Sequence, residues 1–221
     1  SGVHMGERRV TCRRCGRTQA VAIPPEIAAY EQFHDIDRNA WSYDGIQYCV
    51  ARGLMSGTDT HTFLPGGETT RAQLVQVLYH LAGDPDMTGV TTPFTDLTSD
   101  WYLAAVAWAY ETGVVDGTSP TTFSPGRPVT REQAAVLLMR YAARLPGFAG
   151  SDAPADLSAF ADGGSVSGWA RAGMADAVAL GLFGGTQDSS GRVWLRPGES
   201  ATRAEIAAVL ARFGRNVAHL L

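Results

Sequence analysis

Three short stretches of the sequence share one pattern that indicates the start of a helix: Thr70-Arg71-Ala72-Gln73, Thr130-Arg131-Glu132-Gln133 and Thr202-Arg203-Ala204-Glu205. Each is a threonine followed three residues later by glutamine or glutamate, the pattern of a helix capping box. The threonine hydroxyl accepts from the N3 amide, while the N3 side chain accepts from the N-cap amide. Apolar residues at helical spacing follow each stretch. The sequence therefore predicts three helices, each with arginine in its first position.

The capping boxes end a longer motif that occurs three times. An aromatic-x-Asp triplet, ending at Asp35, Asp96 or Asp162, opens each copy. From the tryptophan onward, the first two copies align without a gap at an offset of 60 residues, whereas the third has extra residues in its loop. The shared positions are Trp41, Gly53, Gly57, Phe63, Pro65, Thr70 and Arg71; Trp101, Gly113, Gly117, Phe123, Pro125, Thr130 and Arg131; and Trp169, Gly181, Gly185, Trp194, Pro197, Thr202 and Arg203.

A first helix is expected between the tryptophan and the first glycine of each copy. Apolar or small residues recur there at i, i+3 and i+4, which marks one helical face. Gly53, Gly113 and Gly181 then suit a left-handed C-terminal cap, and Cys49 is expected to be a small buried residue. In the loop, Gly57 and its counterparts should provide a positive φ or a close backbone approach. The residues expected to plug the core are Phe63, Phe123 and Trp194.

A helix-loop-helix unit of this size buries too little surface to fold alone, so the three units should pack on one another. We predict an all-α fold in which they form a pseudo-threefold trimer around a shared helical core. The expected boundaries are 33–87, 88–150 and 151–221. Residues 1–32 are expected to hold a tag remnant, a strand-like end of an upstream module, and a linker. Cys12 and Cys15 form a single C-x-x-C there, whose state the sequence leaves open.

Composition excludes several classes of function. The net charge of −4 argues against a nucleic-acid partner, which needs a basic face. No apolar run is long enough to span a membrane. All 18 basic residues are arginine, which removes lysine chemistry. Histidines do not recur among the repeats, and no catalytic motif is evident, so we expect no metal, no cofactor and no enzyme. The scattered histidines are His4, His34, His61, His80 and His219.

The repeated arginine is the most suggestive residue chemically. It sits at the positive end of a helix dipole, where a cation is disfavoured, yet all three copies have it. One interpretation is a structural ion pair with the aspartate of the aromatic-x-Asp triplet. The other is a site for a carboxylate or phosphate, in which the tryptophan offers a face to a sugar. Trp41, Trp101 and Trp169 have their own alternative, as core anchors of the first helices.

This order of motifs resembles three tandem S-layer homology (SLH) repeats over residues 33–215. The resemblance implies a three-repeat module that holds bacterial surface proteins non-covalently on secondary cell-wall polymers attached to peptidoglycan, often through a pyruvylated sugar. It places the protein outside the cell, at the cell wall or S-layer. We expect the isolated module to be a monomer. A carboxylate-bearing carbohydrate agrees with the anion site suggested by the arginines.

Carried over by motif, the family's ligand-contacting arginine falls on Arg71, Arg131 and Arg203. The resemblance also assigns groove-lining roles to Thr70, Thr130, Thr202, Gly57, Gly117 and Gly185. Two departures make the grooves unequal: the acid of the third capping box is glutamine in the first two, and the third loop is longer. We therefore rank the first two grooves above the third. The alternative function is a protein–protein or self-association module of a surface protein.

Overall fold

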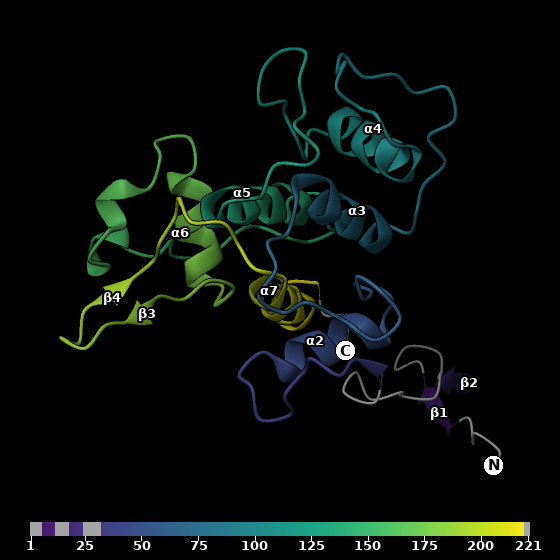
Figure 1. The fold of residues 1–221 in the computed structure, drawn as a ribbon, viewed down its shortest axis with the longest axis horizontal. Coiled ribbons are helices and arrows are strands. Elements are labelled where there is room, and N and C mark those ends of the chain that lie inside the picture. The colour runs from purple at the N-terminus through teal and green to yellow at the C-terminus, as the bar shows by residue number, and fades with distance from the viewer. Residues whose placement is uncertain (1–5, 12–17, 24–31, 219–221) are drawn as a thin grey trace.

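The computed structural model describes residues 6–11, 18–23 and 32–218, and this part of the chain is mostly helical. Three short 3-10 helices, η1 (Asp100–Tyr102), η2 (Leu157–Ala159) and η3 (Gly163–Ser165), accompany the α-helices in the connections. Within the described residues, the α-helices are α2 (Tyr43–Ala51), α3 (Arg71–Leu81), α4 (Leu103–Glu111), α5 (Arg131–Ala142), α6 (Arg171–Ala179) and α7 (Arg203–Asn216) (Figure 1).

Two small antiparallel hairpins complete the described chain. β1 (Gly6–Thr11) pairs with β2 (Thr18–Ile23), with Gly6 opposite Ile23. A strand in the N-terminal segment was expected from the sequence. Cys12 and Cys15 lie outside the described residues, as do His4 and His219. The second hairpin, β3 (Thr186–Gln187) and β4 (Val193–Trp194), was not anticipated and takes up the extra length of the third loop.

The helices pair between repeats. The second helix of each repeat packs against the first helix of the next, so α3 lies on α4 and α5 lies on α6. The third repeat packs on the first in the same way, because α7 lies against α2 (Figure 1). Each repeat therefore buries its apolar helix faces on its neighbours, as expected for units too small to fold alone. A threefold relation among the repeats stays a prediction.

The contact between α2 and α7 shows how closely these helices approach. A Cβ atom at Gly45 would lie 2.7 Å from Cα of Ala208, so a larger residue would force the helices apart. Cys49 on the same face is fully buried, as predicted, and its Sγ lies 3.6 Å from the carbonyl oxygen of Ala207. Burial raises the pKa of the Cys49 thiol to about 12. This cysteine is a core residue with little thiolate character.

Glycines end the first helices and shape the loops. Gly53, Gly113 and Gly181 have φ values of 66°, 71° and 70°, which confirms the left-handed caps. Gly57 serves the other purpose considered: a Cβ atom there would overlap the carbonyl oxygen of Asp59 and the ring of Phe33. The chain needs glycine at this position because backbone and side chains close tightly around it.

One predicted core residue was wrong in the third repeat. Phe63 and Phe123 are fully buried, but the equivalent buried position is Leu195, not Trp194. The aspartate contacts decide this, since Asp162 accepts from the amides of Leu195 and Arg196 just as Asp35 accepts from those of Phe63 and its successor. Trp194 instead belongs to the hairpin strand β4 and is only half-buried. Matching aromatic with aromatic misplaced the alignment by one residue.

Candidate functional site: three grooves between repeats

All three predicted capping boxes are present. Thr70, Thr130 and Thr202 each accept a hydrogen bond from the N3 amide, and the N3 side chain accepts one from the N-cap amide. The helices consequently begin at Arg71, Arg131 and Arg203, as the sequence predicts. These threonine hydroxyls are used in capping.

Each repeated arginine reaches into the loop of the next repeat. The Nε atom of Arg71 donates to the carbonyl oxygen of Phe123 at 2.9 Å, and its Nη2 donates to that of Asp116 at 3.4 Å. Arg131 does the same to Leu195 and Gly184 in the third repeat. Arg203 closes the order by donating to Phe63 and Ser56 in the first. Backbone hydrogen bonds join the same pairs of repeats. For example, the Arg71 amide donates to the carbonyl oxygen of Arg127 at 2.9 Å.

The predicted alternative of an arginine–aspartate ion pair is wrong. Asp35, Asp96 and Asp162 each accept two backbone N–H bonds from the loop of their own repeat, at 2.7 to 2.9 Å. These bonds hold in place the loop whose carbonyl oxygens accept hydrogen bonds from the arginine of the preceding repeat. Neither Arg71 nor Arg203 has a carboxylate within ion-pair distance among the residues that the structure describes.

The three arginines are buried, with exposed fractions of only 5% for Arg71, 9% for Arg131 and 7% for Arg203. Burial lowers the pKa of Arg71 and the neighbouring Arg127 lowers it further, while the charge of Asp96 acts in the opposite direction. Burial also lowers the pKa of Arg203, and the charge of Asp35 opposes this. Both guanidinium groups lie over aromatic rings, with Cζ 4.8 Å from the Phe123 centroid and 4.5 Å from the Phe63 centroid respectively. A buried cation without a carboxylate partner is a favourable neighbour for an anion.

Three grooves lie beside these arginines, with volumes of about 470, 380 and 290 Å³. Each groove is named here for the repeat that supplies its loop and second helix. In all three, the preceding repeat contributes its arginine and the following repeat its tryptophan. Groove 1 has Gly57, Gln73, Arg203 and Trp101; groove 2 has Gly117, Gln133, Arg71 and Trp169; groove 3 has Gly185, Glu205, Arg131 and Trp41.

The tryptophans are not core anchors. Trp41, Trp101 and Trp169 have exposed fractions of 68%, 52% and 59%. This corrects the interpretation that they hold the first helices in the core, and it leaves an aromatic face at each groove. Such a face, with a few fixed polar groups, suits a carbohydrate.

The structure brings most of the predicted site residues together, but not all of them. The arginines, loop glycines and tryptophans line the grooves, whereas Thr70, Thr130 and Thr202 are not among the lining residues. Thr69 lines groove 1 alone, and the threonines that line all three grooves at an equivalent place are Thr58, Thr118 and Thr186. Sequence reasoning missed them, although each directly follows a predicted glycine and so recurs with it.

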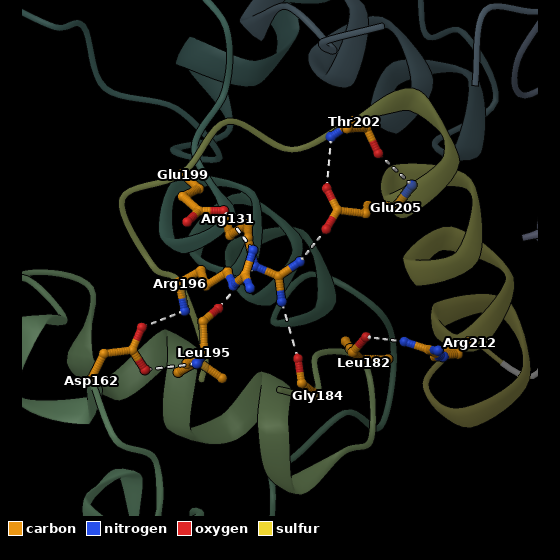
Figure 2. A network of polar contacts seen from close by, with 10 residues as sticks. All are labelled: Arg131, Asp162, Leu182, Gly184, Leu195, Arg196, Glu199, Thr202, Glu205 and Arg212. Atoms are coloured by element: carbon orange, nitrogen blue, oxygen red, sulfur yellow. Dashed lines mark hydrogen bonds and ion pairs between the residues drawn. The ribbon is translucent and has the colours of Figure 1, made fainter. Parts of the chain in front are cut away.

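Groove 3 carries a carboxylate paired with its repeated arginine, and grooves 1 and 2 have no such pair among the described residues. The Nη1 atom of Arg131 forms an ion pair with Oε1 of Glu205 at 2.8 Å, while Oε2 of the same carboxylate accepts from the Thr202 amide (Figure 2). At the equivalent places, grooves 1 and 2 have the neutral side chains of Gln73 and Gln133. The position facing the arginine is therefore occupied by the protein's own carboxylate in groove 3 only.

Two kinds of feature are absent from residues 6–11, 18–23 and 32–218. No cluster of three or more histidine, cysteine, aspartate or glutamate residues there could hold a metal ion. No helix in these segments has the length and apolar character needed to cross a bilayer.

Comparison with known protein families also identifies three repeats. The S-layer homology domain matches this sequence three times, at residues 32–75, 93–135 and 159–207, which together make up more than half of the chain. The chain belongs to the S-layer homology domain family. Membership of the SLH family implies a role in anchoring at the cell surface.

Related proteins include both surface-layer proteins and enzymes. The SLH chain is 31% identical over 90% of its length to a surface-layer 125 kDa protein of Lysinibacillus sphaericus. It is 31% identical over 84% of its length to an amylopullulanase of Thermoanaerobacterium thermosulfurigenes, and 28% identical over 87% to the S-layer protein sap of Bacillus anthracis. The matches cover only 16%, 10% and 22% of these relatives, so the shared part is a small module within much longer proteins.

Proposed function

We propose that this SLH module anchors its protein to the bacterial cell wall by binding a secondary cell-wall polymer in the grooves between repeats. The ligand proposed is an anionic polysaccharide, with a carboxylate such as that of a pyruvylated sugar as the group recognised. This carboxylate would lie beside the repeated arginine while the sugar ring packs on the tryptophan face. The three grooves would then be related by a pseudo-threefold arrangement of the repeats.

One observation carries the proposal. In grooves 1 and 2, a buried guanidinium group is fixed by carbonyl oxygens through Nε and Nη2, yet no described carboxylate pairs with it. Its orientation is set before any ligand arrives, which reduces the entropic cost of binding. A ligand carboxylate there would form a charge-assisted hydrogen bond in a partly desolvated place, where such bonds are strong.

Groove 3 is ranked below the other two for a physical reason. A ligand carboxylate entering it must compete with Glu205 for Arg131, and the two negative charges would repel each other. The same ranking was predicted from the altered capping box and the longer loop of the third repeat. The ion pair supplies the electrostatic basis for it.

We also propose that the module acts by binding rather than by catalysis. The three recurring aspartates were the best candidates for paired catalytic acids. Each is committed to two backbone hydrogen bonds within its own loop, which supports a structural role. An assay that detects cleavage of the wall polymer by this chain would contradict the proposal.

The deciding experiment is a sedimentation assay with purified cell walls. We expect the SLH chain to bind native walls, to lose binding when the secondary polymer is chemically stripped, and to lose most of it when pyruvate groups alone are removed. Binding should weaken with added salt, because part of the attraction is ionic. Full retention on stripped walls would contradict the proposal and favour a protein or bare-peptidoglycan partner.

A further inference from the structure

The grooves differ in charge beyond the arginine that they share. Groove 2 is lined by Arg71, Arg127 and Arg140 together with Asp116, three positive charges against one negative, for a net charge of +2. Groove 1 has Arg203 and the imidazole of His80, for a net charge of +1 with the histidine neutral. An excess of cations around one cleft raises the local concentration of anionic ligands.

The extra cations of groove 2 come from two positions that differ among the repeats. Arg140 lies nine residues after the capping-box arginine, where the first repeat has His80 and the third has Arg212. Arg127 lies in the loop, where the equivalent residues are Gly67 and Glu199. Groove 2 thus combines a cation at both positions, and its counterparts do not.

These side chains are accessible to a ligand. Arg127 is exposed, and the side chain of Arg140 keeps 39% of its surface. Arg140 pairs with Asp116 at 2.7 Å, but the Asp116 side chain is 75% exposed, and ion pairs so exposed contribute little. Arg127 is also close enough to lower the pKa of the buried Arg71. Negative charge bound beside each of these two guanidinium groups would relieve the repulsion between them.

From this arrangement we propose that groove 2 recognises two neighbouring anionic groups on its ligand, one at Arg71 and a second at Arg127 and Arg140. Groove 1 accepts a single anion. The ligand class for groove 2 is a polyanionic glycan segment, in which a second carboxylate or a phosphate lies next to the first acidic group. This proposal rests on the proposed function, since it assigns a specificity to one of the same grooves.

The test uses simple carboxylates as probes and the indole N–H signals of the complete ¹⁵N-labelled chain as readout. Trp169 reports on groove 2 and Trp101 on groove 1, each signal being assigned with a Trp→Phe variant. Acetate is compared with malonate, succinate and glutarate. We expect the best dicarboxylate to bind at Trp169 about five-fold more tightly than acetate, as two exposed charge contacts would give. At Trp101 the difference should stay within about two-fold.

Inorganic phosphate forms a further arm, because it carries its charge on one group. A preference for a dicarboxylate over phosphate at Trp169 would indicate two separated anions. The reverse order would indicate a single phosphate bridging the arginines, which contradicts the proposed two-site arrangement.

Variants that exchange groove 2 residues for those of groove 1 provide the matched control. Arg127→Gly together with Arg140→His should reduce dicarboxylate affinity at Trp169 to that of acetate. The response at Trp101 and the thermal transition should remain, because both replaced side chains are solvent-accessible. Asp116→Asn should instead tighten dicarboxylate binding, since it removes the competing acid.

Equal affinities of acetate and every dicarboxylate at Trp169 would overturn the inference while leaving the single-anion site of the proposed function in place. A preference that survives the double variant, or that Trp101 shows equally, would overturn it as well. If no probe shifts Trp101 or Trp169, both the inference and the anion site of the proposed function fail.

Discussion

Grooves 2 and 3 share one construction and differ at the residue facing the buried arginine. In groove 2 the N3 side chain of the capping box is Gln133, and in groove 3 it is Glu205, which pairs with Arg131 at 2.8 Å. The same helix-capping residue therefore has two consequences. A glutamine caps the helix and forms no ion pair with the arginine, whereas a glutamate caps the helix and pairs with the arginine. Helix capping and the pairing of the buried arginine are set by a single position.

The largest effect should come from removing the arginines. Arg131→Ala leaves the carbonyls of Leu195 and Gly184 and the carboxylate of Glu205 without their donor. We expect the free energy of unfolding to fall by about 3 kcal/mol. Arg71→Ala removes bonds to carbonyls alone and should lower it by about 2 kcal/mol. Urea denaturation of both variants measures the difference.

Equal losses in the two variants would show that the Glu205 pair adds nothing to stability. The sequence alone predicts that replacing Arg71 or Arg131 with alanine weakens wall binding and leaves the thermal transition nearly unchanged. Their burial against the neighbouring repeat changes that expectation. Wall binding by arginine variants is therefore informative only when measured below the unfolding transition of each variant.

The next effect concerns binding and exchanges the two capping residues. Glu205→Gln should release Arg131 and let groove 3 take up acetate, seen as a new shift of the Trp41 indole signal. Gln133→Glu should place a carboxylate beside Arg71 and weaken acetate binding at Trp169 about ten-fold. Both substitutions preserve the capping box, because either residue can accept from the N-cap amide. An unchanged Trp41 response in the first variant would show that the hairpin, not the ion pair, closes groove 3.

A smaller effect sharpens the comparison of groove 1 with groove 2. The hydroxyl of Thr69, in the wall of groove 1, is buried without a hydrogen-bond partner among the described residues, and the equivalent residue of the second repeat is Val129. A buried polar group without a partner is destabilising. Thr69→Val should raise the free energy of unfolding by about 1 kcal/mol. A loss of stability, measured by urea denaturation, would mean that the hydroxyl has an acceptor in solution.

The smallest expected effect is local and depends on pH. Hydrogen bonds from Ser190 and Trp194 hold the pKa of Asp188 well below its usual range. A lowered pKa stabilises the folded hairpin above the ordinary carboxyl pKa of about 3.9, and this contribution is lost as the pH falls through the lower, folded value. The Trp194 indole signal should therefore change only in acid, below about pH 3.9. Asp188→Asn should abolish the titration of the Trp194 signal, while Trp101, which belongs to the second repeat, serves as a control.

Contacts within a few residues could be predicted from the sequence, but contacts between side chains of different repeats could not. The capping boxes, the glycine caps and the buried Cys49 follow from spacing within a few residues. The destinations of Arg71, Arg131 and Arg203 do not, because they depend on which repeat lies next in space. A pairing with the nearby aspartates was a reasonable electrostatic expectation. The aspartates are instead saturated by loop amides, whose donors no charge pattern reveals.

The groove residues divide in the same way. Recurrence identified the arginines, loop glycines and tryptophans, but exposure of the tryptophans could not be decided from a helical pattern. Trp194 was misassigned because residue type outweighed position, whereas Leu195 fills the equivalent buried place. Thr58 and its counterparts were overlooked although they recur, because the adjacent glycine accounted for the repeated pair.

The closure of the third repeat on the first has a consequence for engineering. Since α7 packs on α2 and Arg203 binds the first loop, no repeat is terminal in the usual sense of a solenoid. A circular permutant, with its old ends joined and new ends opened in the linker after Gly83, should reach the same fold. Deleting one repeat, or inserting a fourth, would leave helix faces and arginines without the surfaces that receive them.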